Sequence, residues 1–186
     1  MKKVCFITVF LCVLLFQNKS IAQKFNILDK YPTDISYLHQ NKVNKPVIKV
    51  VYGRPYKDSN KVFGDQIPYG KLWRTGANEA TEVKFYHDVK FGGEIVKAGT
   101  YILHTIPGKN EWTIILNKNI DTWGTCFYDE TKDVIRIKVT PKNANILDVF
   151  SIEFEEHLKK TYMVLAWDTT RVDIPLTVQD NLLAKI

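Results

Sequence analysis

The residues best suited to chemistry lie close together in the segment KLWRTGANEAT at residues 71–81. It places an indole (Trp73), a guanidinium (Arg74), an amide (Asn78) and a carboxylate (Glu79) within seven residues. Arginine offers a planar fork of donors for carboxylate, phosphate or sugar oxygens, and aromatic walls with a few polar groups are the usual form of a small-molecule site. The segment therefore predicts either a ligand cradle or a rigid loop. In the rigid loop, Trp73 is buried and Arg74 is held by Glu79 or another loop acid.

Other segments also lack the alternation of apolar and polar residues that is typical of strands. They are YGRPY at residues 52–56 and DTWG at residues 121–124, and a single histidine stands in the apolar run YILHTI at residues 101–106. Loops carry function more often than the faces of sheets do. The candidate ligand-binding residues are therefore Tyr52, Arg54, Trp73, Arg74, Asn78, Glu79, His104, Trp123 and Tyr128.

Catalytic patterns are weak in this sequence. None of the serines stands in a Gly-x-Ser-x-Gly motif, and the four histidines lack the spacing of metal ligands. The loop acids Glu79, Asp121, Asp129 and Asp168 could supply a glycosidase pair, but nothing in the sequence selects two of them. We expect His104 to form one hydrogen bond in the core rather than to act as a base. The sequence thus leans away from an enzyme, assigns no catalytic residue, and predicts no metal and no cofactor.

The first 22 residues have the pattern of a secretory signal peptide, with two lysines, an apolar run and small residues before position 23. The apolar run is shorter than the roughly 20 residues of a membrane span. We predict cleavage after Ala22 and a periplasmic or secreted mature protein without a membrane span; an uncleaved N-terminal anchor is the alternative. Cleavage removes three lysines and no acid, so the formal charge falls from +6 to +3 and gives no case for nucleic-acid binding.

Only one of the three cysteines, Cys126, lies after the predicted leader. An intramolecular disulfide is therefore not expected, and the hydrophobic core must stabilise the fold alone. In a strand-rich chain such a cysteine is expected to be a small buried hydrophobe.

Apolar and polar residues alternate from residue 45 onward, in runs at residues 47–52, 82–86, 112–117, 135–139, 150–155, 163–167 and 172–176. This period is typical of half-buried strands, and the pairs Gly92-Gly93 and Pro107-Gly108 are typical of the turns between them. We predict one antiparallel β-sandwich over residues 45–180, jelly-roll-like, with eight or nine strands and little helix. A closed barrel is the alternative. Residues 23–44 are expected to form a loosely attached N-terminal arm, and residues 181–186 a C-terminal tail.

Much of the chain resembles one known family. The matching stretches are YGRP at 52–55, PYGKLWRTGANEAT at 68–81, AGTYILHTIPGKNEWTIILN at 98–117, WG at 123–124, YDETKDVIRIKV at 128–139 and WDTTRVDIPL at 167–176. They resemble an uncharacterised family of exported bacterial proteins, common among Bacteroidota, that is catalogued as domain of unknown function 2911. The resemblance runs from about residue 45 to residue 178. It implies an exported all-β domain and no particular activity.

The function expected from the sequence is a non-catalytic binding module of the cell envelope, for a glycan or a small anionic metabolite. One alternative is an envelope hydrolase that uses loop carboxylates with His104 as helper. Another is a structural or partner-binding envelope protein with no small ligand. The sequence gives no indication of the oligomeric state.

Overall fold

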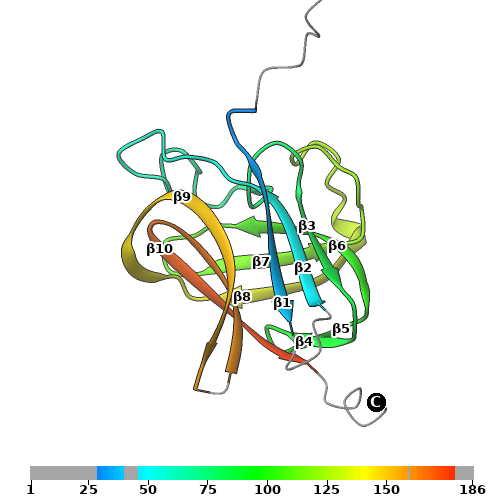
Figure 1. Ribbon diagram of the computed structural model, residues 1–186. Helices are drawn as coiled ribbons and strands as arrows, with labels where there is room; N and C mark the ends of the chain where they lie inside the picture. Colours follow the sequence, from blue (N-terminus) through cyan, green and yellow to red (C-terminus); the bar gives the residue numbers. More distant parts are fainter. Residues whose placement is uncertain (1–28, 40–45, 159, 179–186) are drawn as a thin grey trace, which may run out of the picture.

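The chain forms two antiparallel sheets (Figure 1), and the computed structural model describes residues 29–39, 46–158 and 160–178. The larger sheet contains, in spatial order, β1 (Thr33–His39), β2 (Pro46–Gly53), β3 (Thr81–Phe85), β6 (Gly99–Ile106), β7 (Trp112–Asn117) and β8 (Asp133–Val139). The smaller sheet contains β5 (Glu94–Val96), β4 (Val89–Phe91), β10 (Lys160–Val178) and β9 (Lys142–His157). A single 3-10 turn, η1 (Glu130–Lys132), is the helical element of the described residues.

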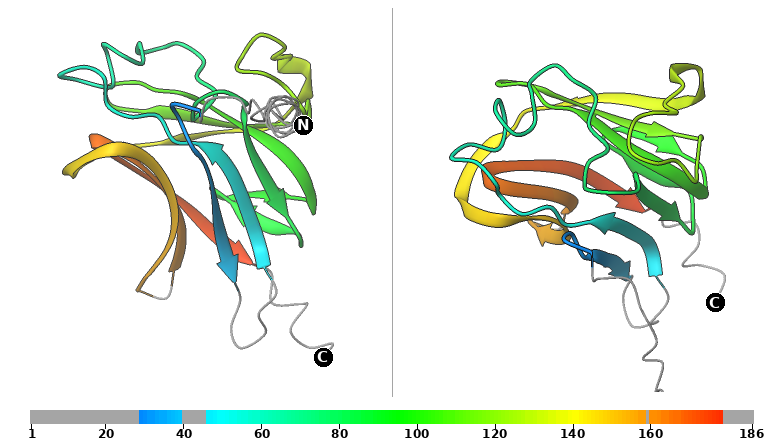
Figure 2. Two further views of the ribbon diagram at one scale, coloured as in Figure 1. Left: turned by 45° about the horizontal axis from the view of Figure 1, so that its top comes forward. Right: turned by 90° about the horizontal axis from the view of Figure 1, so that it is seen from above.

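The two sheets lie as separate layers, as the two views of Figure 2 show. The predicted β-sandwich is therefore confirmed, with ten strands in the described part of the chain rather than eight or nine. The sheets are open rather than joined into a closed barrel. The predicted leader and the predicted C-terminal tail lie outside the described residues.

Strand register explains which side chains face the core of the sandwich and which face outward. Val50 pairs with Val83, and both point into the core, where they are fully buried. The next residues along, Val51 and Glu82, pair with each other on the outer face, because successive side chains of a strand point to opposite faces. Glu82 in turn pairs with Ile102 of β6, so the outer face also has a defined row of residues.

A group of large aromatic side chains fills one end of the core. Trp73 packs against Phe150 at a ring-centroid distance of 5.0 Å and lies stacked on Trp167 at 5.9 Å. Phe63 packs edge-to-face on Trp112 at 4.7 Å. Such pairs contribute about 0.5–1.5 kcal/mol each beyond their burial. This aromatic cluster stabilises the fold without any disulfide in the described residues, where Cys126 is a free thiol.

Residues 33–39 differ from the expectation of a loosely attached arm, because they form β1 and pair with β2 over its whole length. The structural reason is an inverted pattern. The apolar side chains of Ile35 and Tyr37 are exposed, whereas the polar Ser36 is buried. Because this edge strand buries Ser36 and exposes Ile35 and Tyr37, its sequence does not mark an apolar face toward the core.

Among the described residues no helix is long and apolar enough to cross a membrane.

Candidate functional site

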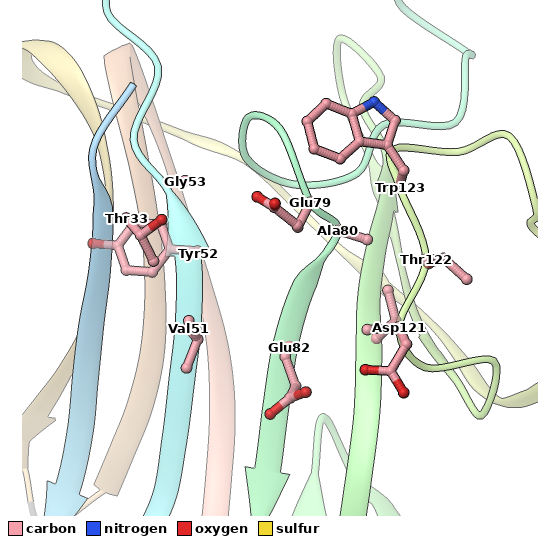
Figure 3. A pocket seen from close by; sticks show the side chains of 11 residues that line it. Thr33, Val51, Tyr52, Gly53, Glu79, Ala80, Glu82, Asp121, Thr122 and Trp123 are labelled. Carbon is pink, nitrogen blue, oxygen red and sulfur yellow. The ribbon is translucent and has the colours of Figure 1, made fainter. Parts of the chain in front are cut away.

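A cavity of about 440 Å³ lies on the outer face of the six-stranded sheet, between β1 and β2 on one side and the loop at residues 118–129 on the other (Figure 3). This volume falls within the range of roughly 300–1,000 Å³ that small-molecule sites occupy. We call it the acidic cavity. It is lined by Thr33, Val51, Tyr52, Gly53, Glu79, Ala80, Glu82, Ile102, Asp121, Thr122 and Trp123.

Among the described residues, three carboxylates and no basic side chain line the acidic cavity. Glu79 comes from the loop before β3, Glu82 from the outer face of β3, and Asp121 from the loop after β7 (Figure 3). None of the three forms an ion pair or a side-chain hydrogen bond with any other described residue, and each is at least partly exposed. The cavity therefore presents unneutralised negative charge, which favours a ligand with ammonium groups or hydroxyl donors.

The apolar side of the acidic cavity is formed by an exposed indole and by aliphatic side chains. Trp123 is 53% exposed and lies at the rim, above Glu79 and Asp121 in Figure 3. Val51 and Ile102 add aliphatic surface from the sheet. An exposed tryptophan beside carboxylates offers a flat apolar face and several hydrogen-bond acceptors in one place.

The walls of the cavity are held together through backbone contacts. Residues Glu79 and Trp123 form an isolated antiparallel bridge, and the amide of Ala80 donates to the carbonyl of Thr122 at 3.2 Å. The loop that carries Asp121 and Trp123 is thus fixed to the segment that carries Glu79. Because these contacts use the backbone, they leave the carboxylates and the indole free for a ligand.

Strained backbone conformations gather around this cavity. Thr75, Asn78 and Asp121 have positive φ angles of 56°, 60° and 58°. Such a conformation is uncommon for residues other than glycine and is an outlier for a β-branched threonine, at a cost of order 1–3 kcal/mol. Thr75 is held by hydrogen bonds to the Thr105 hydroxyl at 3.1 Å and from the Thr81 hydroxyl at 2.7 Å. Strain of this kind often accompanies functional loops.

Arg74 does not form the ion pair with Glu79 that the sequence suggested, so that prediction is wrong. Its guanidinium donates to the carbonyl of Asn78 at 2.7 Å, and no acid pairs with it in the described part of the chain. The guanidinium lies against Gly124, where an added Cβ would come within 3.1 Å of the Arg74 Cζ. Arg74 therefore holds its own loop, at the carbonyl of Asn78, against the loop that contains Gly124. It does not line the cavity.

Arg54, rather than Arg74, pairs with an acid and ties separate segments together. Its three guanidinium nitrogens donate to Asp34 at 3.0 Å, to the carbonyl of Phe150 at 3.2 Å and to the Ser151 hydroxyl at 2.8 Å. These contacts join β1 and the end of β2 to β9. Arg54 is thus a structural residue that fixes the edge of the sandwich, outside the cavity.

Tyr52 lines the cavity, but its hydroxyl faces the interior of the sandwich. The hydroxyl donates to the carbonyl of Ile152 at 3.4 Å and accepts from the amide of the same residue at 3.0 Å. Burial raises the pKa of Tyr52 to about 12, so it stays protonated at all ordinary pH values. It supplies a wall and no acid–base group.

Trp73 and Asn78 have structural roles. Trp73 is 6% exposed within the aromatic cluster, and its Nε1 donates to the carbonyl of Gly76 at 3.1 Å. The side-chain amide of Asn78 donates to Asp29 at 2.7 Å, on the segment that leads into β1. Of the four candidate residues in KLWRTGANEAT, the structure brings only Glu79 into the cavity.

His104, which is buried, and Tyr128, which is half-buried, lie together in a polar group beside the cavity. Their rings contact edge-to-face at 5.2 Å, and the Tyr128 hydroxyl donates to Asp133 at 2.7 Å. Asp133 also accepts from Arg136 at 2.8 Å and from Asn117 at 2.7 Å. The Nδ1 of His104 is buried and has no partner among the described residues. Neither His104 nor Tyr128 lines the cavity.

Burial lowers the pKa of His104 to about 4, although the Asp133 carboxylate and the Trp73 carbonyl act in the opposite direction. Burial, reinforced by Asp133, raises the pKa of Tyr128 to about 12. His104 is therefore neutral and Tyr128 is protonated near neutral pH. This group closes the loop at residues 118–129 onto the outer face of the sheet and offers no base to the cavity.

Sequence reasoning missed the part of the cavity that comes from strand faces. Glu82 sits in a regular strand, and only the register between β2, β3 and β6 places it beside Val51 and Ile102. Its outward position in the alternation was the available signal. Asp121 was recognised only as one loop acid among several. Cys126, expected to be buried, is exposed in the same loop as Asp121.

Within the described ranges, no group of three or more histidine, cysteine, aspartate or glutamate side chains is arranged to hold a metal ion. Comparison with known proteins gives one result, which is that residues 35–176 match a family described as protein of unknown function (DUF2911). The chain belongs to the DUF2911 family. No curated protein and no solved structure matches the chain. In this DUF2911 protein the matched region includes most of β1 and every residue named in the lining of the acidic cavity except Thr33.

Proposed function

We propose that this protein is a non-catalytic binding module of the cell envelope, and that its ligand is a neutral or amino-bearing glycan. The observation that carries the proposal is the acidic cavity, in which three unpaired carboxylates lie beside the exposed indole of Trp123. Sugar rings stack on aromatic faces, and their hydroxyl or ammonium groups donate hydrogen bonds to carboxylates. Both parts of that recognition meet in one cavity.

The charge of the cavity separates the two ligand classes that the sequence left open. An anionic metabolite would bring negative charge to Glu79, Glu82 and Asp121, and like charges across a binding site cost several kcal/mol. A glycan with neutral hydroxyls meets no such penalty, and one with ammonium groups gains Coulomb energy. The geometry therefore supports the glycan and disfavours the anionic metabolite at this site.

A second candidate, glycoside hydrolysis, is favoured by the convergence of three carboxylates on one cavity. Glycosidases use two carboxyl groups on opposite sides of the scissile bond, one of which must be protonated to act as the acid. His104 takes no part in this scheme, because it lies outside the cavity. We rank this candidate second because acids that bind hydroxyl groups account for the same geometry without a reaction.

The envelope location rests on the N-terminal sequence, which has the features of a signal peptide ending at Ala22. Expression of the full chain in a Gram-negative host, followed by mass analysis of the protein from the periplasmic and envelope fractions, tests this part. We expect a protein that begins at Gln23. A full-length protein confined to the cytoplasm would contradict it.

Calorimetric titration with three tetrasaccharides tests the ligand. They are a glucosamine oligomer, a glucose oligomer and a galacturonic acid oligomer, which carry positive charge, no charge and negative charge, respectively. We expect the glucosamine oligomer to bind most tightly and the galacturonic acid oligomer not to bind. The variant Glu82→Gln should weaken binding by about 10- to 100-fold, whereas Glu94→Gln, on the exposed strand β5, should leave it unchanged.

Two outcomes would overturn parts of this proposal. No binding of any oligomer at millimolar concentration, or tightest binding of the galacturonic acid oligomer, would remove the glycan assignment. Chromatography of the incubated oligomers tests the second candidate in the same samples. Release of shorter sugars, lost in Glu82→Gln or Glu79→Gln, would establish hydrolysis in place of simple binding.

A further inference from the structure

A second cavity, of about 240 Å³, opens where four separate segments of the chain meet. Its floor is aromatic, formed by Phe63 and Trp112 of the buried cluster, and polar groups stand around its mouth. We call it the basic cavity. It is lined by Lys61, Phe63, Tyr69, Gly108, Lys109, Trp112, Pro141, Lys142, Asn143, Thr169 and Thr170.

The charge of this cavity is opposite to that of the acidic cavity. In the part of the chain that the structure describes, three lysines line it, and no aspartate or glutamate does. Lys142 pairs with Asp173 at 2.9 Å, which lies outside the lining. Lys61 lies over the ring of Tyr69 at 5.9 Å, and neither Lys61 nor Lys109 pairs with a carboxylate among the residues that the structure describes. Two ammonium groups at the mouth are thus available for a ligand.

The segments around the basic cavity are held in place by contacts that a ligand would not disturb. Asp168, at a φ of 53° and an irregularity in the pairing of β9 with β10, accepts from Lys57 at 2.7 Å and from the amide of Val62 at 3.1 Å. These bonds fix the loop that carries Lys61 to the strand that carries Thr169 and Thr170. The cavity is therefore a built feature of the fold.

The turn that carries Lys109 is equally constrained. Gly108 stands so close to the Glu111 carbonyl oxygen that any Cβ there would overlap it. The carbonyl of Pro107, just before that glycine, accepts from the amide of Gly70 at 2.8 Å. Lys109 is thus presented from a tight, anchored turn.

We propose that the basic cavity binds a compact anionic group, such as a phosphate or sulfate, that enters between Lys61 and Lys109. Ammonium groups and threonine hydroxyls are donors, and charge-assisted hydrogen bonds to anionic oxygens are roughly twice as strong as neutral ones. The volume lies just below the usual range for small-molecule sites, which suits a small group better than a whole sugar. This second site is independent of the glycan proposal.

The same anionic group could belong to a free small molecule, to a sulfated or phosphorylated sugar, or to a lipid headgroup. A recessed cavity with an aromatic floor admits a single projecting group. We therefore expect a soluble ligand, rather than a flat membrane surface, to place its anionic group there. The probes are therefore inorganic pyrophosphate, a sulfated glucosamine disaccharide, and vesicles of phosphatidylcholine with one quarter phosphatidylglycerol. Each is titrated into the protein at 50 mM and at 200 mM salt.

We expect one pyrophosphate or one sulfated disaccharide to bind per chain, more weakly at the higher salt concentration. Lys109→Gln and Lys61→Gln should each weaken this binding by about 10- to 100-fold. The matched control is Lys90→Gln, which removes an exposed lysine of β4 and the same net charge, and should have little effect. Thermal melts of all variants check that the fold is retained, which we expect because the three lysines are exposed.

Three results would overturn the proposal. The first is the absence of saturable binding of either soluble anion at millimolar concentration. The second is an equal loss of affinity in Lys90→Gln, which would indicate attraction by net charge alone. The third is binding to the anionic vesicles without binding of pyrophosphate or the disaccharide, which would indicate a membrane-facing surface instead of a cavity for one group.

Discussion

The acidic cavity and the basic cavity have opposite charge, although both form where loops meet the sandwich. The acidic cavity lies on the outer face of the six-stranded sheet, and its described lining has three carboxylates and no basic residue. The basic cavity has an aromatic floor of core residues, and three lysines but no acid line it among the residues that the structure describes. Negative and positive side chains thus line separate cavities. The formal net charge of the chain, +6 including the predicted leader, hides this separation and is a poor guide to either ligand.

The buried aromatic cluster connects the two regions. Phe63 and Trp112 form the floor of the basic cavity, and both contact Trp73, at centroid distances of 5.8 and 6.4 Å. The segment that begins with Trp73 continues to Glu79 and Ala80 in the acidic cavity. A change at Trp73 should therefore disturb both sites, whereas changes at the cavity surfaces should affect only one.

The largest expected effect is that of Trp73→Ala. Removing a buried tryptophan leaves a large void and should lower the free energy of unfolding by about 3–5 kcal/mol. Chemical denaturation measures it. The milder variant Trp73→Phe should cost less, because it keeps much of the aromatic packing. Retention of wild-type stability and of both binding activities in Trp73→Ala would break the link that we draw between the two regions.

The second-largest expected effect is a loss of folding stability at low pH, caused by His104 beside the acidic cavity. Burial lowers the pKa of His104 to about 4, below the value of 6.5 that it has when unfolded. Between these values the unfolded chain binds the proton and the folded chain does not, so stability falls as pH falls from 6.5 to 4. The loss should approach about 3 kcal/mol below pH 4. Stability is fully retained above pH 6.5.

Denaturation of the wild type and of His104→Phe across pH 4–8 isolates this contribution. The variant keeps a ring against Tyr128 but has no proton to gain, so its stability should fall less between pH 6.5 and 4. Parallel curves for the two proteins would show that His104 titrates normally in the folded state. At pH 4.5 we also expect glycan binding to weaken before anion binding does, because the ring of His104 packs on Tyr128 in the loop of the acidic cavity.

The sequence predicted the sandwich because buried strands such as β7 and β10 carry strong apolar runs and because glycine and proline mark several turns. It did not predict β1, in which the apolar Ile35 and Tyr37 face solvent and Ser36 is buried. For this strand the pairing with β2 decides the structure. Contacts of its side chains with other segments, such as that of Asp34 with Arg54, add to this pairing.

The sequence located the loops of the acidic cavity but misjudged the roles of their residues. Structural hydrogen bonds are made by Trp73, Arg74 and Asn78. The cavity is lined instead by Glu79 and Trp123. The basic cavity was missed entirely, because Lys61, Lys109 and Lys142 stand far apart in the sequence and meet only through the fold. Spacing along the chain reveals a site only when one segment supplies it.

Removing the charges of each cavity tests most directly whether the two cavities bind different ligands. The triple variant Glu79→Gln, Glu82→Gln, Asp121→Asn should lose at least as much glycan affinity as one charge-assisted hydrogen bond provides, about 1.5–3 kcal/mol, and keep its affinity for pyrophosphate. The double variant Lys61→Gln, Lys109→Gln should show the reverse. Calorimetry of both variants with both ligands measures all four affinities.

The same triple variant should be as stable as the wild type or more stable, by up to about 1 kcal/mol, since it removes repulsion between exposed like charges. Higher stability with lost binding is the usual mark of residues kept for function. If each variant weakened both ligands equally, the two cavities would not be independent sites. A marked loss of stability in the triple variant would instead make the acids structural.

The smallest effect on stability should come from Trp123→Ala, and it contrasts the two tryptophans of the site region. Trp123 is 53% exposed, so its removal should change the free energy of unfolding by no more than about 0.5 kcal/mol, far less than the removal of Trp73. Stacking on a sugar ring contributes about 1 kcal/mol, so glycan affinity should fall several-fold while pyrophosphate affinity stays constant. Trp123→Phe should recover part of the loss. Unchanged glycan affinity in Trp123→Ala would leave recognition to the carboxylates alone and would favour a ligand without a sugar ring, such as a simple polyamine.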